Sequence, residues 1–171
     1  IADAGFAGAE VFENDLLSTH LSAREIAKLM RELGLACTMF QPFRDLEGLP
    51  EAQRARAFDR LERKFDVMAE LETDLLLVCS SCSPLADGER GRMLADLHEA
   101  GTRAAARGLR IGYEALAWGR HVHDHRDAWP DTGRQRGDDR SGGRRRRIIM
   151  GSTTMIDPVP RRASTAFEHP Q

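Results

Sequence analysis

The segment Arg110–Asp124, RIGYEALAWGRHVHD, holds the residues whose types and spacing are best suited to chemistry. A short apolar run ends on Glu114, and a stretch rich in Trp, Arg and His follows it. At the carboxyl end of a parallel strand, Glu114 would present a hard oxygen ligand or a general base to a shared crevice. The alternative is that Glu114 only caps the strand or pairs with Arg120, because carboxylates also occupy structural ion-pair networks.

Two more polar segments follow apolar runs, Glu13–Asp15 and Gln41–Glu47. If the preceding runs are parallel strands, both segments lie at the same edge as Glu114. Within the second segment, Arg44 carries the guanidinium fork that binds a carboxylate with two hydrogen bonds. Its alternative is a structural ion pair with Asp45 or Glu47.

The histidines and cysteines give weaker indications. His121, His123 and His125 alternate, and His121 and His125 have the spacing that brings two imidazoles together on a helix. Cys79 and Cys82 form one CxxC pair without a second pair to complete a zinc site. We therefore interpret Cys79 as a small buried thiol at the end of a strand.

Length and composition bound the class of protein. The chain has 171 residues, 41% of them hydrophobic, which fits one globular domain. Its apolar runs are far shorter than the roughly 20 residues of a transmembrane helix, so we expect no membrane partner. Three cysteines without a secretory signal predict reduced thiols and a cytoplasmic location.

The charge is distributed unevenly along the chain. Acidic residues outnumber basic ones up to Trp129, whereas basic residues dominate afterwards, and only Lys28 and Lys64 are lysines. This change predicts a folded domain at 1–129 and an irregular Arg/Gly-rich tail at 130–171. Arg144–Arg147 would attract polyanions electrostatically, but no aromatic residues are interleaved, so specific nucleic-acid recognition is not expected.

The first 129 residues alternate between strand and helix patterns. The predicted strands are Ala9–Phe12, Leu35–Phe40, Leu75–Cys79 and Arg110–Glu114. The predicted helices begin with a capping box at Ser22–Glu25, at Pro50 and near Gly88, and they end near Gly34, Leu71 and Gly108. Strands that alternate with helices of crossover length predict an α/β fold with a parallel sheet.

A barrel is the favoured form of this sheet, because no glycine-rich phosphate fingerprint follows any strand. A complete (β/α)8 barrel needs eight strands and about 250 residues, and only four βα units are visible. We therefore expect a partial TIM barrel. Its open edges predict aggregation or self-association of half-barrels.

The motifs carry a resemblance to a known family. AGFAGAEVFENDLL, TMFQPFRDLEG, RKFDVMAELETDLLLVCS and GLRIGYEALAWGRHVHD together resemble the bacterial 3-dehydroshikimate dehydratases, which belong to the xylose isomerase-like TIM barrels of the sugar phosphate isomerase/epimerase superfamily. These dehydratases are often fused to a half that resembles 4-hydroxyphenylpyruvate dioxygenase. The resemblance covers about residues 4–129.

The resemblance implies a reaction and a site. It implies loss of water from 3-dehydroshikimate to give protocatechuate, with a divalent metal (Mg, Mn or Co) that stabilises enolate charge. Glu114 would be one metal ligand. His121 and Arg120 would be proton carrier and anion stabiliser, and the substrate would contact Arg44, Gln41 and Glu10.

The sequence also departs from the family pattern. The family's first strand is missing, and a strand ending in Asp-Ser-Phe-His, which would supply further metal ligands, is replaced by Arg/Gly-rich sequence after Trp129. Either a shifted reading frame or a genuine basic tail would account for this replacement. The chain thus resembles a truncated, inactive lyase, with a sugar isomerase or epimerase and a non-catalytic interaction module as alternatives.

Overall fold

The computed structural model describes residues 1–128 and 153–156. The strands and helices of this part follow one another in the order predicted for an α/β fold. The strands are β1 (Gly8–Phe12), β2 (Ala36–Phe43), β3 (Leu75–Cys79), β4 (Arg110–Glu114) and β5 (Thr153–Ile156). The α-helices are α1 (Glu13–Ser18), α2 (Ala23–Glu32), α3 (Glu51–Leu71), α4 (Arg90–Ala106) and α5 (His125–Ala128), and a 3-10 turn lies at Ala2–Ala4.

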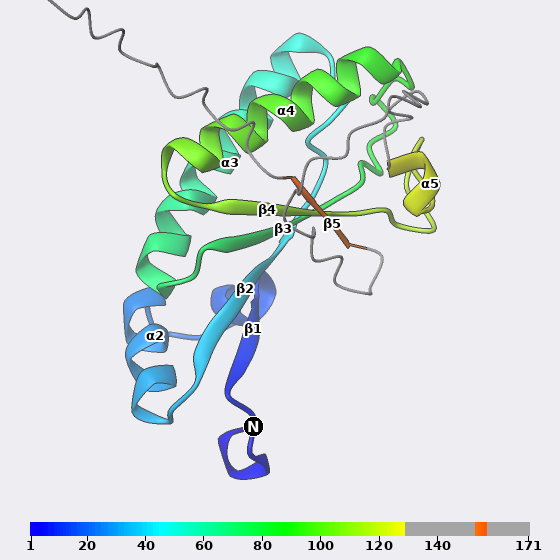
Figure 1. Ribbon diagram of the computed structural model, residues 1–171. Coiled ribbons are helices and arrows are strands. Elements are labelled where there is room, and N and C mark those ends of the chain that lie inside the picture. The colour runs from blue at the N-terminus through cyan, green and yellow to red at the C-terminus, as the bar shows by residue number, and fades with distance from the viewer. Residues whose placement is uncertain (129–152, 157–171) are drawn as a thin grey trace, which may run out of the picture.

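The strands form one sheet in the order β1-β2-β3-β4-β5 (Figure 1). Neighbouring strands from β1 to β4 are parallel, and each is joined to the next through helical segments. The predicted parallel α/β arrangement of four βα units is therefore confirmed. Because parallel strands point the same way, the segments that leave β1, β2, β3 and β4 meet at one edge of the sheet, called here the carboxyl edge.

The fifth strand comes from the region predicted to be irregular. Thr153–Ile156 pairs antiparallel with β4, with Ile156 opposite Ile111 and Thr153 opposite Glu114. No hydrophobic periodicity in residues 130–171 predicts a strand at this place. Arg144–Arg147 and the proposed boundary at Trp129 lie outside the described residues, so the division into 1–129 and 130–171 stays a prediction.

Local sequence signals explain most element boundaries. Ser22 accepts a hydrogen bond from the Glu25 amide while the Glu25 side chain binds the Ser22 amide, so the predicted capping box is formed. Pro50 is the N-cap of α3. Strands β3 and β4 have the predicted bounds, because their uninterrupted apolar residues are buried.

Two predicted loop segments have regular structure instead. Glu13–Asp15, predicted as a polar segment after a strand, forms the first turn of α1, where acidic side chains are stabilised by the helix dipole. Gln41 lies within β2 rather than after it, opposite Phe12. β2 continues to Phe43, because this side chain is buried and its residue is opposite Val78 in β3.

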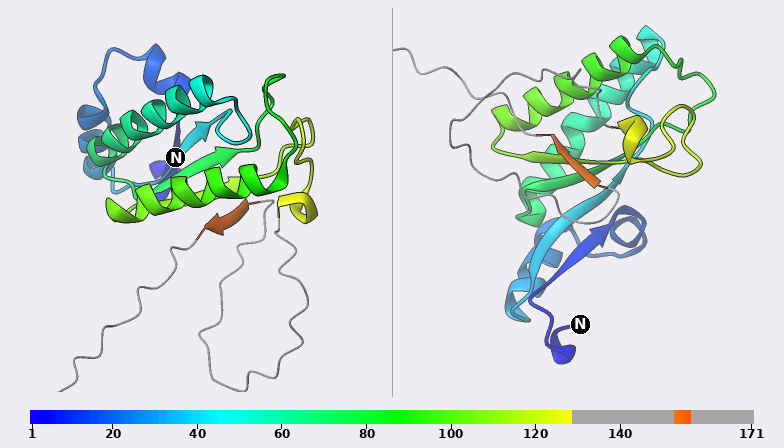
Figure 2. Two further views of the ribbon diagram at one scale, coloured as in Figure 1. Left: turned by 90° about the horizontal axis from the view of Figure 1, so that it is seen from above. Right: turned by 45° about the vertical axis from the view of Figure 1, so that its right-hand side comes forward.

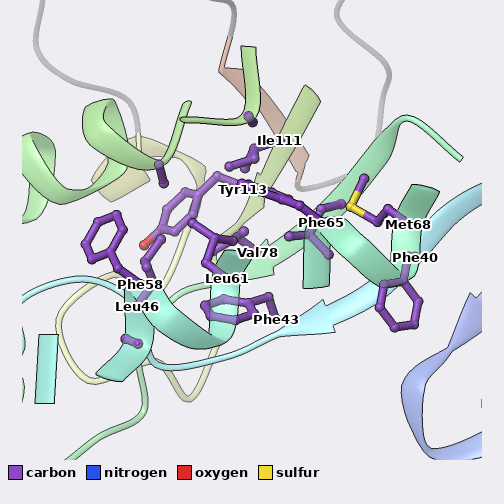
Figure 3. Packing of buried hydrophobic residues seen from close by; sticks show 14 of the residues in the cluster. Phe40, Phe43, Leu46, Phe58, Leu61, Phe65, Met68, Val78, Ile111 and Tyr113 are labelled. Atoms are coloured by element: carbon purple, nitrogen blue, oxygen red, sulfur yellow. The ribbon is translucent and has the colours of Figure 1, made fainter. Parts of the chain in front are cut away.

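The main core lies between the sheet and helices α2, α3 and α4 (Figures 1 and 2). Figure 3 shows its centre, where aromatic and aliphatic side chains of α3 pack on the strands. The largest of these side chains are almost fully buried: Phe40, Phe43, Leu61, Phe65, Met68 and Tyr113. No helix among the described residues has the length and apolar character needed to cross a bilayer.

The two faces of β3 carry separate clusters. Leu76 and Val78 belong to the main core on the helical face, whereas Leu77 and Cys79 form a small cluster with Leu116. Because successive side chains of a strand point to opposite faces, the second cluster lies on the face away from the helices. In a closed barrel this face becomes the interior.

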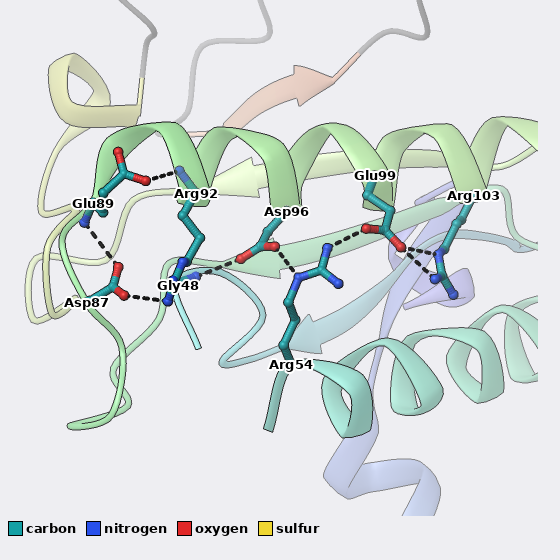
Figure 4. A network of polar contacts seen from close by, with 8 residues as sticks. All are labelled: Gly48, Arg54, Asp87, Glu89, Arg92, Asp96, Glu99 and Arg103. Carbon is teal, nitrogen blue, oxygen red and sulfur yellow. Dashed lines mark hydrogen bonds and ion pairs between the residues drawn. The ribbon is translucent and has the colours of Figure 1, made fainter. Parts of the chain in front are cut away.

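A polar network joins α3, α4 and the loop after β2 (Figure 4). Asp96 is its centre and is 1% exposed. Its carboxylate accepts hydrogen bonds from the Gly48 amide at 2.9 Å and from Arg54 Nε at 2.6 Å. Arg54 also pairs with Glu99. The network therefore anchors the loop that carries Arg44 to the body of the sheet.

Candidate functional site

Glu114 lies at the carboxyl end of β4, opposite Cys79 in β3. The Cys79 thiol donates a hydrogen bond to Glu114 Oε2 over 3.6 Å, so the carboxylate lies on the face away from the helices. Burial, followed by the negative charge of Glu114, raises the pKa of the Cys79 thiol to about 12. A thiol with this pKa stays protonated at neutral pH, which agrees with the interpretation of Cys79 as a buried structural thiol.

Glu10 and Gln41 are brought together. Glu10 is in β1 and Gln41 is in the neighbouring β2, and Gln41 Nε2 donates a hydrogen bond to Glu10 Oε2 over 2.5 Å. Glu10 is exposed and Gln41 is half-buried. The two side chains thus offer a paired carboxylate and amide near the carboxyl edge.

Arg44 follows β2 and is exposed. The alternative of a structural ion pair is not observed among the described residues, because Asp45 and Glu47 have other partners. Asp45 accepts hydrogen bonds from the Cys82 amide at 2.9 Å and from the Ser81 hydroxyl at 3.3 Å. The positive charge of Arg44 opposes the rise of the Cys79 pKa, which links it electrostatically to the surroundings of Glu114.

His121 and Arg120 connect two loops. His121 Nε2 lies 3.0 Å from the carbonyl oxygen of Ala86, and this nitrogen must carry the hydrogen because a carbonyl oxygen only accepts. The Arg120 amide donates to the Ser81 carbonyl at 2.6 Å, while the Arg120 side chain is exposed. Both residues therefore hold the loop after β4 against the loop after β3.

Two further contacts close this junction. The Ser80 hydroxyl accepts a hydrogen bond from the Leu116 amide at 2.9 Å. Gly119 packs so closely that an added Cβ would lie 2.2 Å from the Val122 carbonyl oxygen and 2.5 Å from the Ser80 hydroxyl. Only glycine fits at this position, so close packing explains why the AWGRH motif has glycine here.

Glu47 is the main residue that sequence reasoning missed. The sequence indicates Glu47 only as a possible partner of Arg44. Its side chain is 2% exposed and forms hydrogen bonds with the loop after β3 and with β4. Glu47 Oε1 accepts from the Ser81 amide at 2.6 Å and from the Tyr113 hydroxyl at 2.8 Å. Glu47 Oε2 has no hydrogen-bond partner within the described part of the chain. No local pattern distinguishes Glu47 from a solvent-exposed loop glutamate.

The burial of Glu47 predicts a pH dependence of stability. Burial raises the pKa of Glu47, and the hydrogen bonds from Ser81 and Tyr113 only partly oppose this. The native state therefore binds this proton more tightly than the unfolded chain. Its stabilising contribution is fully present below the unfolded-state pKa of about 4.3 and is lost as pH rises through the native pKa.

We expect Glu47→Gln to remove this contribution, so that the free energy of unfolding falls less steeply above about pH 4.3 than in the unmodified chain. Denaturant unfolding at a series of pH values measures the slope. The matched control is Asp59→Asn, at an exposed position in the middle of α3, which should keep the slope of the unmodified chain. Identical slopes for all three proteins would contradict the prediction.

A metal site cannot be assembled from the described residues alone. Residues 1–128 contain no group of three or more His, Cys, Asp or Glu side chains that could hold a metal ion. Glu114 is accompanied by a protonated thiol, and His121 uses Nε2 for a backbone contact. His123 and His125 lie at the start of the α5 region, and they do not complete a cluster. Glu114 therefore stays the single proposed metal ligand among the described residues.

The fold and the carboxyl edge define a class of protein: a parallel (β/α) barrel segment with polar residues where its strands end. Residues 1–130 match the family of xylose isomerase-like TIM barrels, so the chain belongs to this family. The predicted partial TIM barrel is thereby confirmed.

Two curated relatives are identical to the chain at about half of the aligned positions. It is 52% identical over 129 residues to a 3-dehydroshikimate dehydratase of Pseudomonas putida, and 54% identical over 129 residues to one of Pseudomonas aeruginosa. Both alignments cover 75% of this chain and 20% of the relative. The chain therefore spans about a fifth of the length of these curated relatives.

A solved structure is similar to the chain to the same degree as these two relatives. A xylose isomerase-like TIM barrel/4-hydroxyphenylpyruvate dioxygenase fusion protein is 52% identical to the chain, with a TM-score of 0.73. The match covers 75% of this chain and 21% of the fusion protein. The predicted resemblance to a dehydratase family with such fusions is confirmed.

Proposed function

We propose that this chain is part of a lyase that removes water from 3-dehydroshikimate to give protocatechuate, in the breakdown of quinate and shikimate. The observation that carries the proposal is the 52% identity over 129 residues to a protein named 3-dehydroshikimate dehydratase. The location of Glu114, Gln41, Glu10 and Arg44 around one sheet edge agrees with a shared site.

The chain's residues would bind and orient the substrate. Arg44, whose guanidinium has no hydrogen-bond or ion-pair partner among the described residues, would bind the substrate carboxylate through its two parallel donors. Gln41 and Glu10 would contact its hydroxyl groups. Arg120 is our proposed anion stabiliser. His121 is proposed as the proton carrier, and its contact with Ala86 also supports a role in positioning the loop.

A divalent metal (Mg, Mn or Co) remains part of the proposal for the complete protein only. Glu114 would supply one ligand, and the described residues supply no complete set. Such an ion would stabilise negative charge on the substrate oxygens. Because the described residues do not fit a complete site, the roles proposed for this chain are binding, orientation and proton transfer by its own side chains.

The alternatives of a sugar isomerase or epimerase and of a non-catalytic module share the same fold. The QPFRD and AWGRH motifs, which place Arg44 and His121, favour the dehydratase. A cytoplasmic location, self-association of the open barrel and the lack of specific nucleic-acid binding stay predictions.

A chimera tests the proposed function. The matching segment of the Pseudomonas putida dehydratase is replaced with residues 1–128 of this chain, and protocatechuate formation from 3-dehydroshikimate is followed by absorbance. We expect kcat/KM within about tenfold of the parent enzyme, a difference of about 1.4 kcal/mol in activation free energy. A folded chimera that dehydrates nothing would overturn the proposal. The 171-residue chain, assayed alongside, measures how much activity this segment has without the rest of the enzyme.

A further inference from the structure

A cleft of about 560 Å³ lies between the start of α1, the end of β2 and the middle of α3. Its walls include the side chains of Arg44, Arg60, Arg63 and Lys64, and its apolar surface includes Phe43 and Val67. This volume is within the range of about 300–1,000 Å³ that is usual for small-molecule sites.

The part of the cleft around Arg63 is separate from the surroundings of Glu114. Phe43 belongs to the core on the helical face of the sheet, and Val67 packs against that core from α3. Glu114 contacts Cys79, which belongs to the cluster on the opposite face. Glu114, Arg120 and His121 do not line the cleft. Arg44 lines the cleft and also acts electrostatically on Cys79, so only the part of the cleft around Arg63 lies away from the proposed substrate site. A ligand held at Arg63 would therefore occupy a different place from one bound at Glu114.

The cleft has an excess of positive charge. Four cationic side chains line it, against the carboxylates of Glu13 and Asp45. Glu13 forms an ion pair with Lys64. Asp45 accepts hydrogen bonds from Ser81 and Cys82, which lie in the loop after β3. Neither carboxylate therefore neutralises the remaining guanidinium groups.

The three arginines of the cleft differ in their contacts. Arg60 Nη2 donates to the carbonyl oxygens of Arg44 and Asp45, at 3.0 and 3.1 Å, which fixes this side chain over the Phe43 ring. The guanidinium groups of Arg44 and Arg63 have no hydrogen-bond or ion-pair partner within residues 1–128. Each has a planar set of donors that matches an oxyanion.

The apolar surface of the cleft restricts the kind of anion. Phe12, Pro42 and Val67, which are half-buried, give it a hydrocarbon wall beside the cations, whereas Phe43 is buried under Arg60. Inorganic phosphate would satisfy the guanidinium groups but leave this wall in contact with water. A carboxylate on a ring or a short hydrocarbon body would satisfy both parts.

We propose that this cleft binds a small organic carboxylate, with its anionic group at Arg63 and its hydrocarbon body against Phe12 and Val67. The inference does not depend on the proposed dehydration, because Arg63 has no part in the site proposed for that reaction.

The test is calorimetric titration of the 171-residue chain with benzoate, acetate and inorganic phosphate. Benzoate should bind more tightly than acetate, which lacks the ring, and more tightly than phosphate. Arg63→Gln should weaken benzoate binding about tenfold, a loss of about 1.4 kcal/mol in binding free energy, because it removes a charge-assisted hydrogen bond. Arg63 is exposed on α3, so its replacement is compatible with folding.

Two control variants distinguish binding in this cleft from general attraction to positive charge and from binding at Glu114. Arg56→Gln removes an exposed arginine of the same helix outside the cleft, and benzoate affinity should stay within about twofold. Glu114→Gln should also leave the affinity unchanged. The proposal is overturned if Arg56→Gln weakens binding as much as Arg63→Gln, if Glu114→Gln changes the affinity, if the three anions bind equally, or if benzoate does not bind.

Discussion

The Asp96→Ala variant is expected to lose about 3 kcal/mol of its free energy of unfolding. Removing one partner of a buried ion pair costs about 3–5 kcal/mol, because the other group is left without compensation. Here the loss lies at the lower end, since Arg54 keeps its pair with Glu99 and its side chain is 24% exposed. The buried Gly48 amide, which donates to Asp96, adds to the loss because it is left unpaired.

Chemical denaturation, with the slope against denaturant checked for two-state behaviour, measures this loss. Asp66→Ala is the matched control, because Asp66 forms an exposed ion pair with Arg107 on the same pair of helices. Such surface pairs contribute about 0–1 kcal/mol. Equal losses in the two variants would mean that the Asp96 network does not stabilise the fold as its burial implies.

The second large effect concerns catalysis. In the active chimera, Glu114→Gln is expected to lower kcat/KM at least about 100-fold, because Glu114 is the proposed metal ligand. Replacing residues that only orient a metal ligand already costs about 10- to 100-fold. Glutamine keeps an oxygen that can accept from Cys79, so the local packing is preserved while the negative charge is removed. The measurement is the steady-state rate of protocatechuate formation, together with the unfolding midpoint of each variant.

The control for this experiment is Glu32→Gln. Glu32 is an exposed residue at the end of α2, away from the carboxyl edge, and it forms an exposed pair with Lys28. Its replacement should change kcat/KM less than about twofold. If Glu114→Gln keeps full activity in a stable chimera, Glu114 has only the strand-capping role that its sequence position also allows.

Regular local patterns make much of the fold predictable. The bounds of β3 and β4 are predicted to the residue because their apolar residues are continuous, and α2 begins where its capping box indicates. α1 is missed because acidic residues in the first turn of a helix resemble those of a polar loop. Gln41 is predicted to follow β2, since the sequence does not indicate that Phe43 pairs with the next strand.

The site is predictable only in part, for a different reason. Glu114 and Arg44 become candidates because Glu114 ends an apolar run and Arg44 follows one, and the structure places both near the same edge. Glu47 and Asp96 look like ordinary polar residues in sequence, and their importance comes from partners far along the chain. Burial of a carboxylate is set by tertiary packing, which no local periodicity describes.

The loops at the carboxyl edge are bonded to one another as well as to the sheet. The loop after β3 receives contacts from Glu47 on one side and from Arg120 and His121 on the other, through the Ser81 backbone and the Ala86 carbonyl. Their conformational entropy has therefore been lost during folding, before any ligand arrives. A ligand that reaches this edge would meet a preorganised surface, so little of its intrinsic affinity would be consumed in ordering these loops.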